Sequence, residues 1–143
     1  KDGYMGNKDS GMPNIKGGFW GLAVADHDKE EIILSNKYYA MGQFSRYIRP
    51  GDTIIHCDKN TLAAYNKGTG KIVVVAVNDT SKTKHITYAL ECFDKIGKTV
   101  EIIRTSGSLE NSEKWANIGT VDITDNKINV DLKSNSVTTF IIK

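Results

Sequence analysis

Apolar and polar positions repeat with a helical period before residue 50 and with a strand period after it. The stretch KYYAMGQFSRYIRPGD, residues 37–52, predicts one amphipathic helix that stops at the Pro-Gly pair. One face of this helix carries apolar side chains three or four residues apart: Tyr38, Met41, Phe44 and Ile48. Ser35 or Asn36 is the expected N-cap, and Gln43 is expected to point away from the apolar face. The helix therefore has a side that needs a packing partner.

The chain after the helix predicts short strands at intervals of roughly ten residues, rich in Val, Ile and Thr. The eight expected strands lie within residues 52–57, 61–66, 71–78, 83–91, 99–106, 119–125, 127–133 and 136–143. The run IVVVAV, residues 72–77, is continuously apolar and is placed at the centre of a sheet, whereas KINVDLK, residues 127–133, alternates and predicts one buried and one solvated face. The whole pattern is typical of a mainly β fold, an antiparallel β-sandwich or barrel.

Two stretches are expected at hairpin tips: NKGTGK, residues 66–71, and TDNK, residues 124–127. Such turns need residues that tolerate a positive φ, and we expect Gly68, Gly70 and Asn126 to supply it. The first tip also echoes a phosphate-binding loop. That loop, however, joins a strand to a helix with a longer glycine spacing, so an ordinary turn is expected here.

The segment before the helix contains little of a core. Residues 1–18 hold five glycines and a proline without a sustained apolar period, which predicts a loop. Residues 19–26 and 31–36 are strand candidates that we expect to pair as a hairpin across a charged turn. Because the chain starts at Lys1 and not at Met, we expect it to be processed or truncated, the tail of a larger protein.

Composition narrows the class of protein only slightly. The 143 residues, 39% of them hydrophobic, suffice for one domain, and the net charge of +2 includes no basic stripe that would indicate nucleic acid or a membrane surface. No run reaches the ~18 apolar residues of a membrane span. Whether Cys57 and Cys92 form a disulfide is left open.

Metal-type and modification motifs are weak. The triplets Asp26-His27-Asp28 and His56-Cys57-Asp58 lack the second, spaced ligand pair of a zinc site, and His85 stands alone in its strand. No metal site and no cofactor are expected. The sequon Asn78-Asp79-Thr80 is expected at an exposed turn.

Carboxylates are the remaining candidates for catalysis, because glycoside hydrolysis needs two of them flanking a bond. Glu30 and Glu31 are neighbours in a charged turn and are not expected to converge on a substrate. The other glutamates considered lie at expected strand ends or in a polar loop: Glu91, Glu101, Glu110 and Glu113. Solvated surface carboxylates are expected at all of these positions, so no catalytic residue is assigned.

Several elements in order carry a family resemblance. They are KYYAMGQFSRYIRPG, then KIVVVAVND, then RTS with EN shortly after (Arg104–Ser106, Glu110, Asn111), and finally SVTTFIIK. From about Gly18 to Lys143 the chain resembles the C-terminal part of glycoside hydrolase family 30, in the manner of an endo-β-1,6-galactanase. In that family a (β/α)8 barrel carries catalysis and a β-sandwich side domain adjoins it.

The resemblance implies a division of the chain. Residues 1–50 correspond to a loop, short strands and the last helix of a truncated barrel, and residues 51–143 to the β-sandwich side domain. The apolar stripe of the helix is then shaped for barrel strands. The family's two catalytic glutamates fall upstream of Lys1, so no residue here inherits their roles.

The resemblance also implies a secreted, extracellular parent enzyme that meets its polysaccharide through the upstream barrel. Within this chain, sugar contact is left to the glycine-rich loop and to Trp20, whose indole suits a sugar face or packing between barrel and sandwich. Among substrates, β-1,6-galactan is favoured, because the helix residues and the RTS with EN pairing most resemble galactanase-type members. The basic, tyrosine-containing motif of glucuronoxylan-specific members is not visible before the helix, which counts against that subgroup.

Two other functions remain open. The runner-up is an autonomous carbohydrate-binding β-sandwich, which needs a flat row of exposed aromatic side chains. The aromatic residues after residue 50 are scattered: Tyr65, Tyr88, Phe93, Trp115 and Phe140. A structural or interaction domain without any saccharide ligand is the third.

Overall fold

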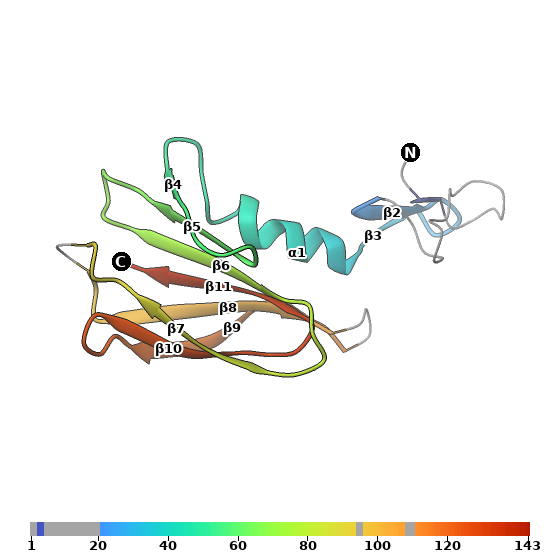
Figure 1. Cartoon of the computed structure of the whole chain (residues 1–143). Coiled ribbons are helices and arrows are strands. Elements are labelled where there is room, and N and C mark those ends of the chain that lie inside the picture. Colours follow the sequence, from blue (N-terminus) through green and yellow to red (C-terminus); the bar gives the residue numbers. More distant parts are fainter. Residues whose placement is uncertain (1–2, 5–20, 94–95, 108–110) are drawn as a thin grey trace.

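The computed structural model describes residues 3–4, 21–93, 96–107 and 111–143. These residues form a mainly antiparallel β structure with one helix (Figure 1). The N-terminal elements are β1 (Gly3–Tyr4), β2 (Ala23–Asp26), β3 (Glu31–Leu34) and α1 (Asn36–Ser45). The later strands are β4 (Thr53–Ile55), β5 (Thr61–Tyr65), β6 (Ile72–Asn78), β7 (Lys84–Ala89), β8 (Thr99–Ser106), β9 (Glu113–Asp122), β10 (Lys127–Leu132) and β11 (Ser136–Ile142). Each of the eight expected strands is present.

A six-stranded sheet forms the centre of the molecule, in the order β4-β5-β6-β11-β8-β9. Every neighbouring pair in it is antiparallel. In β6 every residue except half-buried Val77 is buried, because β5 and β11 flank this strand and both of its faces are covered. The predicted central position of the apolar run is therefore confirmed.

Strands β7 and β10 form a separate two-stranded sheet that packs on one face of the large sheet. The core between the two layers consists mainly of Ala63, Ile72, Val74, Ala76, Leu90, Val100, Ile128, Val130, Leu132, Phe140 and Ile142. Phe140 is fully buried, and its ring centroid lies 5.8 Å from that of Tyr88 on β7. Along β10, buried and exposed residues alternate, which confirms the predicted two-faced strand.

The hairpin tips follow the expected turn chemistry in part. Asp125 and Asn126 have φ of 51° and 55° between β9 and β10, and two successive residues with positive φ are what a type I′ turn needs. Gly70 has φ 72° at the β5–β6 tip. Gly68 is not among the residues with positive φ, so that expectation is wrong: the left-handed position of this tip is taken by Gly70 alone.

Strand β9 starts earlier than predicted, at Glu113 and not near Gly119. Its register with β8 shifts twice, and Trp115 and Gly119 have φ of 51° and 112°. Each irregularity breaks the two-residue period. The first half of β9 therefore has no alternating pattern from which a strand could be predicted.

Helix α1 lies against β8, β9 and β11 of the large sheet. Successive side chains of a strand point to opposite faces, so Thr139, which bonds to α1, faces away from the core that Phe140 enters. The helix therefore covers the outer face of the large sheet, and the molecule has three layers: α1, the six-stranded sheet and the β7–β10 sheet.

The ends of α1 differ from the prediction in detail. Ser35 occupies the N-cap position but makes no side-chain capping bond; its Oγ donates to Leu22 O at 2.7 Å instead. The helix ends at Ser45, five residues before Pro50, and residues 46–48 continue as a turn held by Ile48 N–H donating to Phe44 O at 2.9 Å.

A small sheet, β1-β2-β3, lies beyond the N-terminal end of α1 (Figure 1). Strands β2 and β3 pair as the predicted hairpin. Gly3–Tyr4, expected in a loop, instead forms a short strand parallel to β2, because the backbone of β2 offers it a free edge. The rest of the predicted loop lies outside the described residues. No helix among the described residues is long and apolar enough to cross a membrane.

Candidate functional site

A network of side-chain hydrogen bonds joins α1 to the outer face of the large sheet. We call it the helix–sheet joint. It consists of Tyr39, Gly42 and Gln43 of α1, Thr105 of β8, Trp115 of β9 and Thr139 of β11. The strand residues lie more than 60 positions after the helix residues that they contact, so the joint fixes the position of the helix relative to the β structure.

Gln43 is the centre of the joint and is fully buried. Its Nε2 donates to Thr105 Oγ1 at 2.8 Å, and Thr139 Oγ1 donates to its Oε1 at 2.6 Å. The prediction that Gln43 points away from the packed face is wrong. Helical periodicity assumes an apolar partner, whereas this sheet face offers two threonine hydroxyls.

Trp115 packs against α1 at one side of the joint. Its Nε1 donates to Tyr39 O at 2.7 Å, and its ring centroid lies 4.9 Å from that of Tyr39. The Arg46 guanidinium sits 4.7 Å from the centre of the indole. The opposing helix residue is Gly42, where any Cβ would overlap the indole ring. The helix backbone can approach the tryptophan this closely only because the residue is glycine.

Gln43→Leu is expected to lower the free energy of unfolding by about 1–2 kcal/mol, because the hydroxyls of Thr105 and Thr139 lose their partner in a buried setting. Urea unfolding followed by circular dichroism measures this change. Ser45→Ala, on the exposed side of the same helix, is the matched control and is expected to stay within ±0.5 kcal/mol of wild type. Equal stability of Gln43→Leu and wild type would contradict the prediction.

The other side of α1 is open in the described structure. Met41 is 54% exposed, and a cavity of about 340 Å³ lies beside it. The lining residues are Leu22, Tyr38, Met41, Gly42, Ser45, Arg46, Arg49 and Trp115. Of the predicted apolar stripe, Tyr38, Phe44 and Ile48 are half-buried. The stripe therefore divides: part of it is covered within the chain, while Met41 faces outward.

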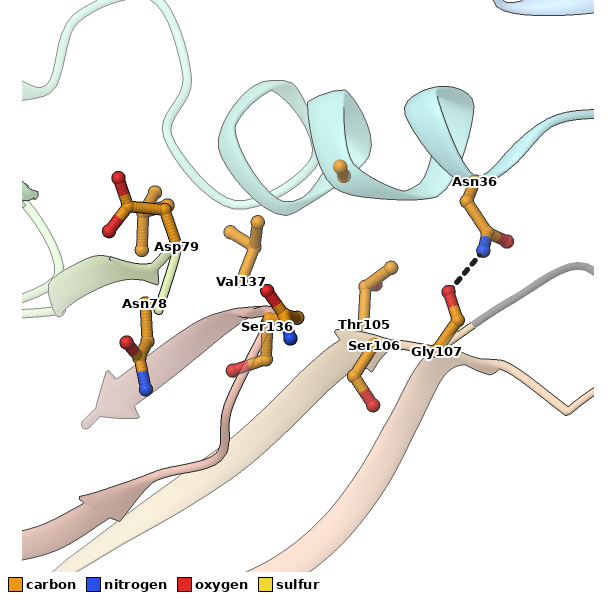
Figure 2. Close-up of a pocket in the computed structure, with 11 residues that line it drawn as sticks. Asn36, Asn78, Asp79, Thr105, Ser106, Gly107, Ser136 and Val137 are labelled. Carbon is orange, nitrogen blue, oxygen red and sulfur yellow. Dashed lines mark hydrogen bonds between the residues drawn. The ribbon is translucent and has the colours of Figure 1, made fainter. Parts of the chain in front are cut away.

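A second cavity, of about 210 Å³, lies between the N-terminal half of α1 and the turns of the large sheet (Figure 2). Ala40, Val77 and Val137 contribute apolar surface to it. Asn36 Nδ2 donates to Gly107 O at 2.6 Å (Figure 2), whereas Asn36 Oδ1 is buried without a hydrogen-bond partner among the described residues. Ser136 Oγ donates to Lys133 O at 2.7 Å. Asp79 is the one carboxylate in its lining.

Glu113 is the carboxylate most altered by its surroundings. Arg104 holds it in a fork, with Nε and one terminal nitrogen each donating to a carboxylate oxygen at 2.7 Å. Ser106 Oγ also donates to it, and Lys133 Nζ lies 3.3 Å away. These partners, Arg104 first, lower the pKa of Glu113 to about 2 against a smaller opposing effect of burial. Glu113 is thus ionised at neutral pH and held by three partners, so the expectation of a solvated surface carboxylate is wrong at this position.

The other candidate glutamates form no pair. Glu101 lies 3.9 Å from Lys143 Nζ, Glu91 is exposed, and Glu30 and Glu31 are exposed in and after the β2–β3 turn. Glu110 lies outside the described residues. A third cavity, of about 300 Å³ on the outer face near the C-terminal end of β11, includes Glu101. Each of the three cavities is therefore lined by at most one carboxylate.

The remaining sequence candidates are structural. Asp26 pairs with Lys29 at 3.5 Å, and His85 pairs with Asp131 on the neighbouring strand at 2.8 Å, so His85 is not alone. Among residues 21–93, 96–107 and 111–143, no three His, Cys, Asp or Glu side chains gather as a metal site would require. Cys57 and Cys92 are free thiols. Trp20, the expected sugar contact, lies outside the described residues.

The described residues thus define an antiparallel β domain with a helix fixed to its outer face. Curated relatives of the chain are polysaccharide hydrolases. An endo-β-1,6-galactanase from Hypocrea rufa is 31% identical over 129 residues, which cover 88% of this chain. A glucuronoxylanase from Bacillus subtilis is 31% identical over 121 residues, which cover 80% of this chain. The chain spans only 27% of the length of each relative. No protein-family model matches it.

The fold comparison agrees. A family 30, subfamily 8 xylanase from Clostridium acetobutylicum matches with a TM-score of 0.66 at 23% identity, over 86% of this chain and 30% of that one. The predicted resemblance to a C-terminal part of a glycoside hydrolase family 30 enzyme is therefore confirmed. The galactanase and the glucuronoxylanase are equally identical to the chain.

Proposed function

We propose that the chain is the C-terminal part of a retaining glycoside hydrolase that acts on β-linked polysaccharide, with β-1,6-galactan as the first candidate. In this proposal the described part is a non-catalytic side domain and the parent enzyme is secreted. The two hydrolase relatives, which are more than three times as long as the matched region, support a parent of this kind.

The two-sided helix is the observation that carries the proposal. The inner side of α1 is bonded to the sheet through Gln43 and Trp115, while Met41 and neighbouring Leu22 are exposed beside a cavity on the outer side. A helix in the outer ring of a (β/α)8 barrel buries an apolar stripe against barrel strands. The exposed side of α1 fits that role, with residues 1–50 as barrel remnants and residues 51–143 as the side domain.

The non-catalytic role rests on the carboxylates. A retaining hydrolase needs two of them about 5 Å apart at a substrate cleft. Glu113 is bound by Arg104, Ser106 and Lys133, and none of the three cavities described above has two carboxylates in its lining. We therefore place both catalytic glutamates in the protein encoded upstream of Lys1, and we keep Trp20 as a proposed sugar contact.

The autonomous binding module is less well supported. Its candidate aromatic side chains are used in packing: Tyr65 with Phe93 at 5.3 Å, Tyr88 with Phe140 at 5.8 Å, and Trp115 with Tyr39. Stacking on a sugar needs a free ring face in a flat row. Tyr65, Tyr88, Phe93 and Phe140 pack in or against the core between the two sheets, and Trp115 packs against α1 on the other face of the large sheet, so these rings do not form an exposed row.

A pure sample of the chain is expected to release no reducing sugar from β-1,6-galactan or glucuronoxylan. The reading frame upstream of the Lys1 codon is expected to encode roughly 300 residues of alternating strands and helices, with glutamates at the ends of two strands. The protein made from the extended frame is then expected to hydrolyse β-1,6-galactan. Turnover by the pure chain, or an extended protein inactive on every β-linked polysaccharide, would reject the proposal.

A further inference from the structure

Asn78, at the end of β6, connects two turns of the β structure. Its side chain is 1% exposed, and Nδ2 donates to three backbone carbonyls: Lys82 O at 2.8 Å, and Leu132 O and Lys133 O at 3.0 Å each. The first carbonyl lies in the β6–β7 turn and the other two at the end of β10. The amide therefore ties the two-stranded sheet to the large sheet at one end of the molecule.

The oxygen of the same amide is also used. Asn78 Oδ1 accepts from the backbone N–H of Thr80 at 3.2 Å and from Thr80 Oγ1 at 2.7 Å. Asn78 and Thr80 are the two specifying residues of the sequon Asn78-Asp79-Thr80. The sequence correctly predicts an exposed turn, because Asp79, Ser81 and Lys82 are exposed; the asparagine side chain, however, folds inward and organises that turn.

We propose that Asn78 is a folding-gated glycosylation site: it is open to N-glycosylation only before these turns close, and a glycan on it excludes the native fold. In the modification, C1 of a saccharide leaves a lipid-diphosphate donor and bonds to Nδ2. The C1–O bond to the diphosphate breaks, the lipid diphosphate departs, and one of the two Nδ2 protons is transferred to water.

The native structure cannot accommodate that product. Three carbonyls share the two Nδ2 protons of Asn78, and glycosylation leaves one proton for them. The saccharide would also have to pass between the β6–β7 turn and the end of β10, where the amide is buried. Buried carbonyls without donors are costly, so the glycan and the closed turns are mutually exclusive.

The chain itself supplies an internal control. Lys67 is exposed at the tip of the β5–β6 hairpin, and Lys67→Asn creates a sequon with Gly68 and Thr69 at a site where a glycan points into solvent. One variant then carries a buried sequon and an exposed one. Trypsin separates the two positions because Lys71 and Lys82 bracket the Asn78 peptide.

The experiment expresses Lys67→Asn through a eukaryotic secretory pathway, separates protease-resistant monomer from aggregate, and measures glycan occupancy at each position by mass spectrometry. We expect position 67 to be occupied in both fractions, and Asn78 to be occupied at least tenfold less in the folded monomer than in the aggregate. An inhibitor of lipid-linked donor synthesis is expected to raise the yield of folded wild-type chain. Protease-resistant monomer with similar occupancy at both positions would overturn the proposal.

Discussion

Gly42→Ala is expected to lower the free energy of unfolding by about 2 kcal/mol and to loosen α1 from the sheet. A Cβ at this position would lie 2.7 Å from Trp115 Cε2 and 2.8 Å from Trp115 Nε1, closer than such atoms approach. The indole cannot easily move aside, because its Nε1 donates to Tyr39 O and Arg46 lies over its ring. Overpacking therefore outweighs the gain of about 1 kcal/mol in helix propensity that alanine brings.

Urea unfolding followed by circular dichroism tests this prediction. Gly68→Ala is the matched control: it is the same substitution at an exposed tip, where the added Cβ meets only Asn66 Oδ1 at 3.4 Å. Combining Gly42→Ala with Trp115→Leu should recover part of the loss, because the smaller side chain relieves the overlap. If Gly42→Ala alone were as stable as wild type, the close approach would not limit the joint.

The β structure was predictable because its signals are local. Each of the eight expected strands is present. The apolar run 72–77 predicts a central strand, and the alternation in 127–132 predicts a strand with one buried and one solvent-facing side. Turn chemistry was similarly local at Asn126, whose positive φ closes the β9–β10 turn. These features depend on neighbours within a few residues, so one sequence suffices to find them.

The helix–sheet joint could not be predicted, because its partners meet only in the folded chain. Gln43 finds Thr105 and Thr139 from positions 62 and 96 residues away. The spacing of apolar residues along a helix cannot identify Gln43 as buried, because its partners are the hydroxyls of two threonines. The pairing of Glu113 with Arg104 was not predicted for a related reason: β9 is irregular, so the sequence does not show the strand that brings Glu113 to Arg104.

The joint also bears on how the chain divides. The proposed boundary at residue 50 separates α1 from the later strands in sequence, yet Gln43 and Tyr39 bond to Thr139 and Trp115 across it. The outer face of the large sheet is therefore completed by a helix assigned to the barrel. In the proposed enzyme, α1 would be shared between the barrel and the side domain, so movement of one would be transmitted to the other.

Glu113→Gln is expected to remove about 2–3 kcal/mol of stability at pH 7 and to flatten the acid limb of the stability profile. The pKa of Glu113 is lowered from an ordinary value near 4.5 to about 2 in the folded chain, chiefly by Arg104. A carboxylate with a lowered folded-state pKa stabilises the fold fully above the unfolded pKa. Its contribution is lost as pH falls from about 4.5 towards 2.

Urea midpoints measured from pH 7 to pH 3 test this expectation. Subtracting the two profiles removes carboxylates common to both proteins, including Asp52, whose pKa is also lowered, first by the Arg49 backbone N–H. Arg104→Lys keeps the positive charge but loses the two-bonded fork, so it should retain part of the pH dependence. Parallel profiles for Glu113→Gln and wild type between pH 5 and pH 3 would mean that the cluster does not stabilise the fold. A difference that grows from pH 3 to pH 5 and then stays level would locate the stabilisation in the Glu113 anion.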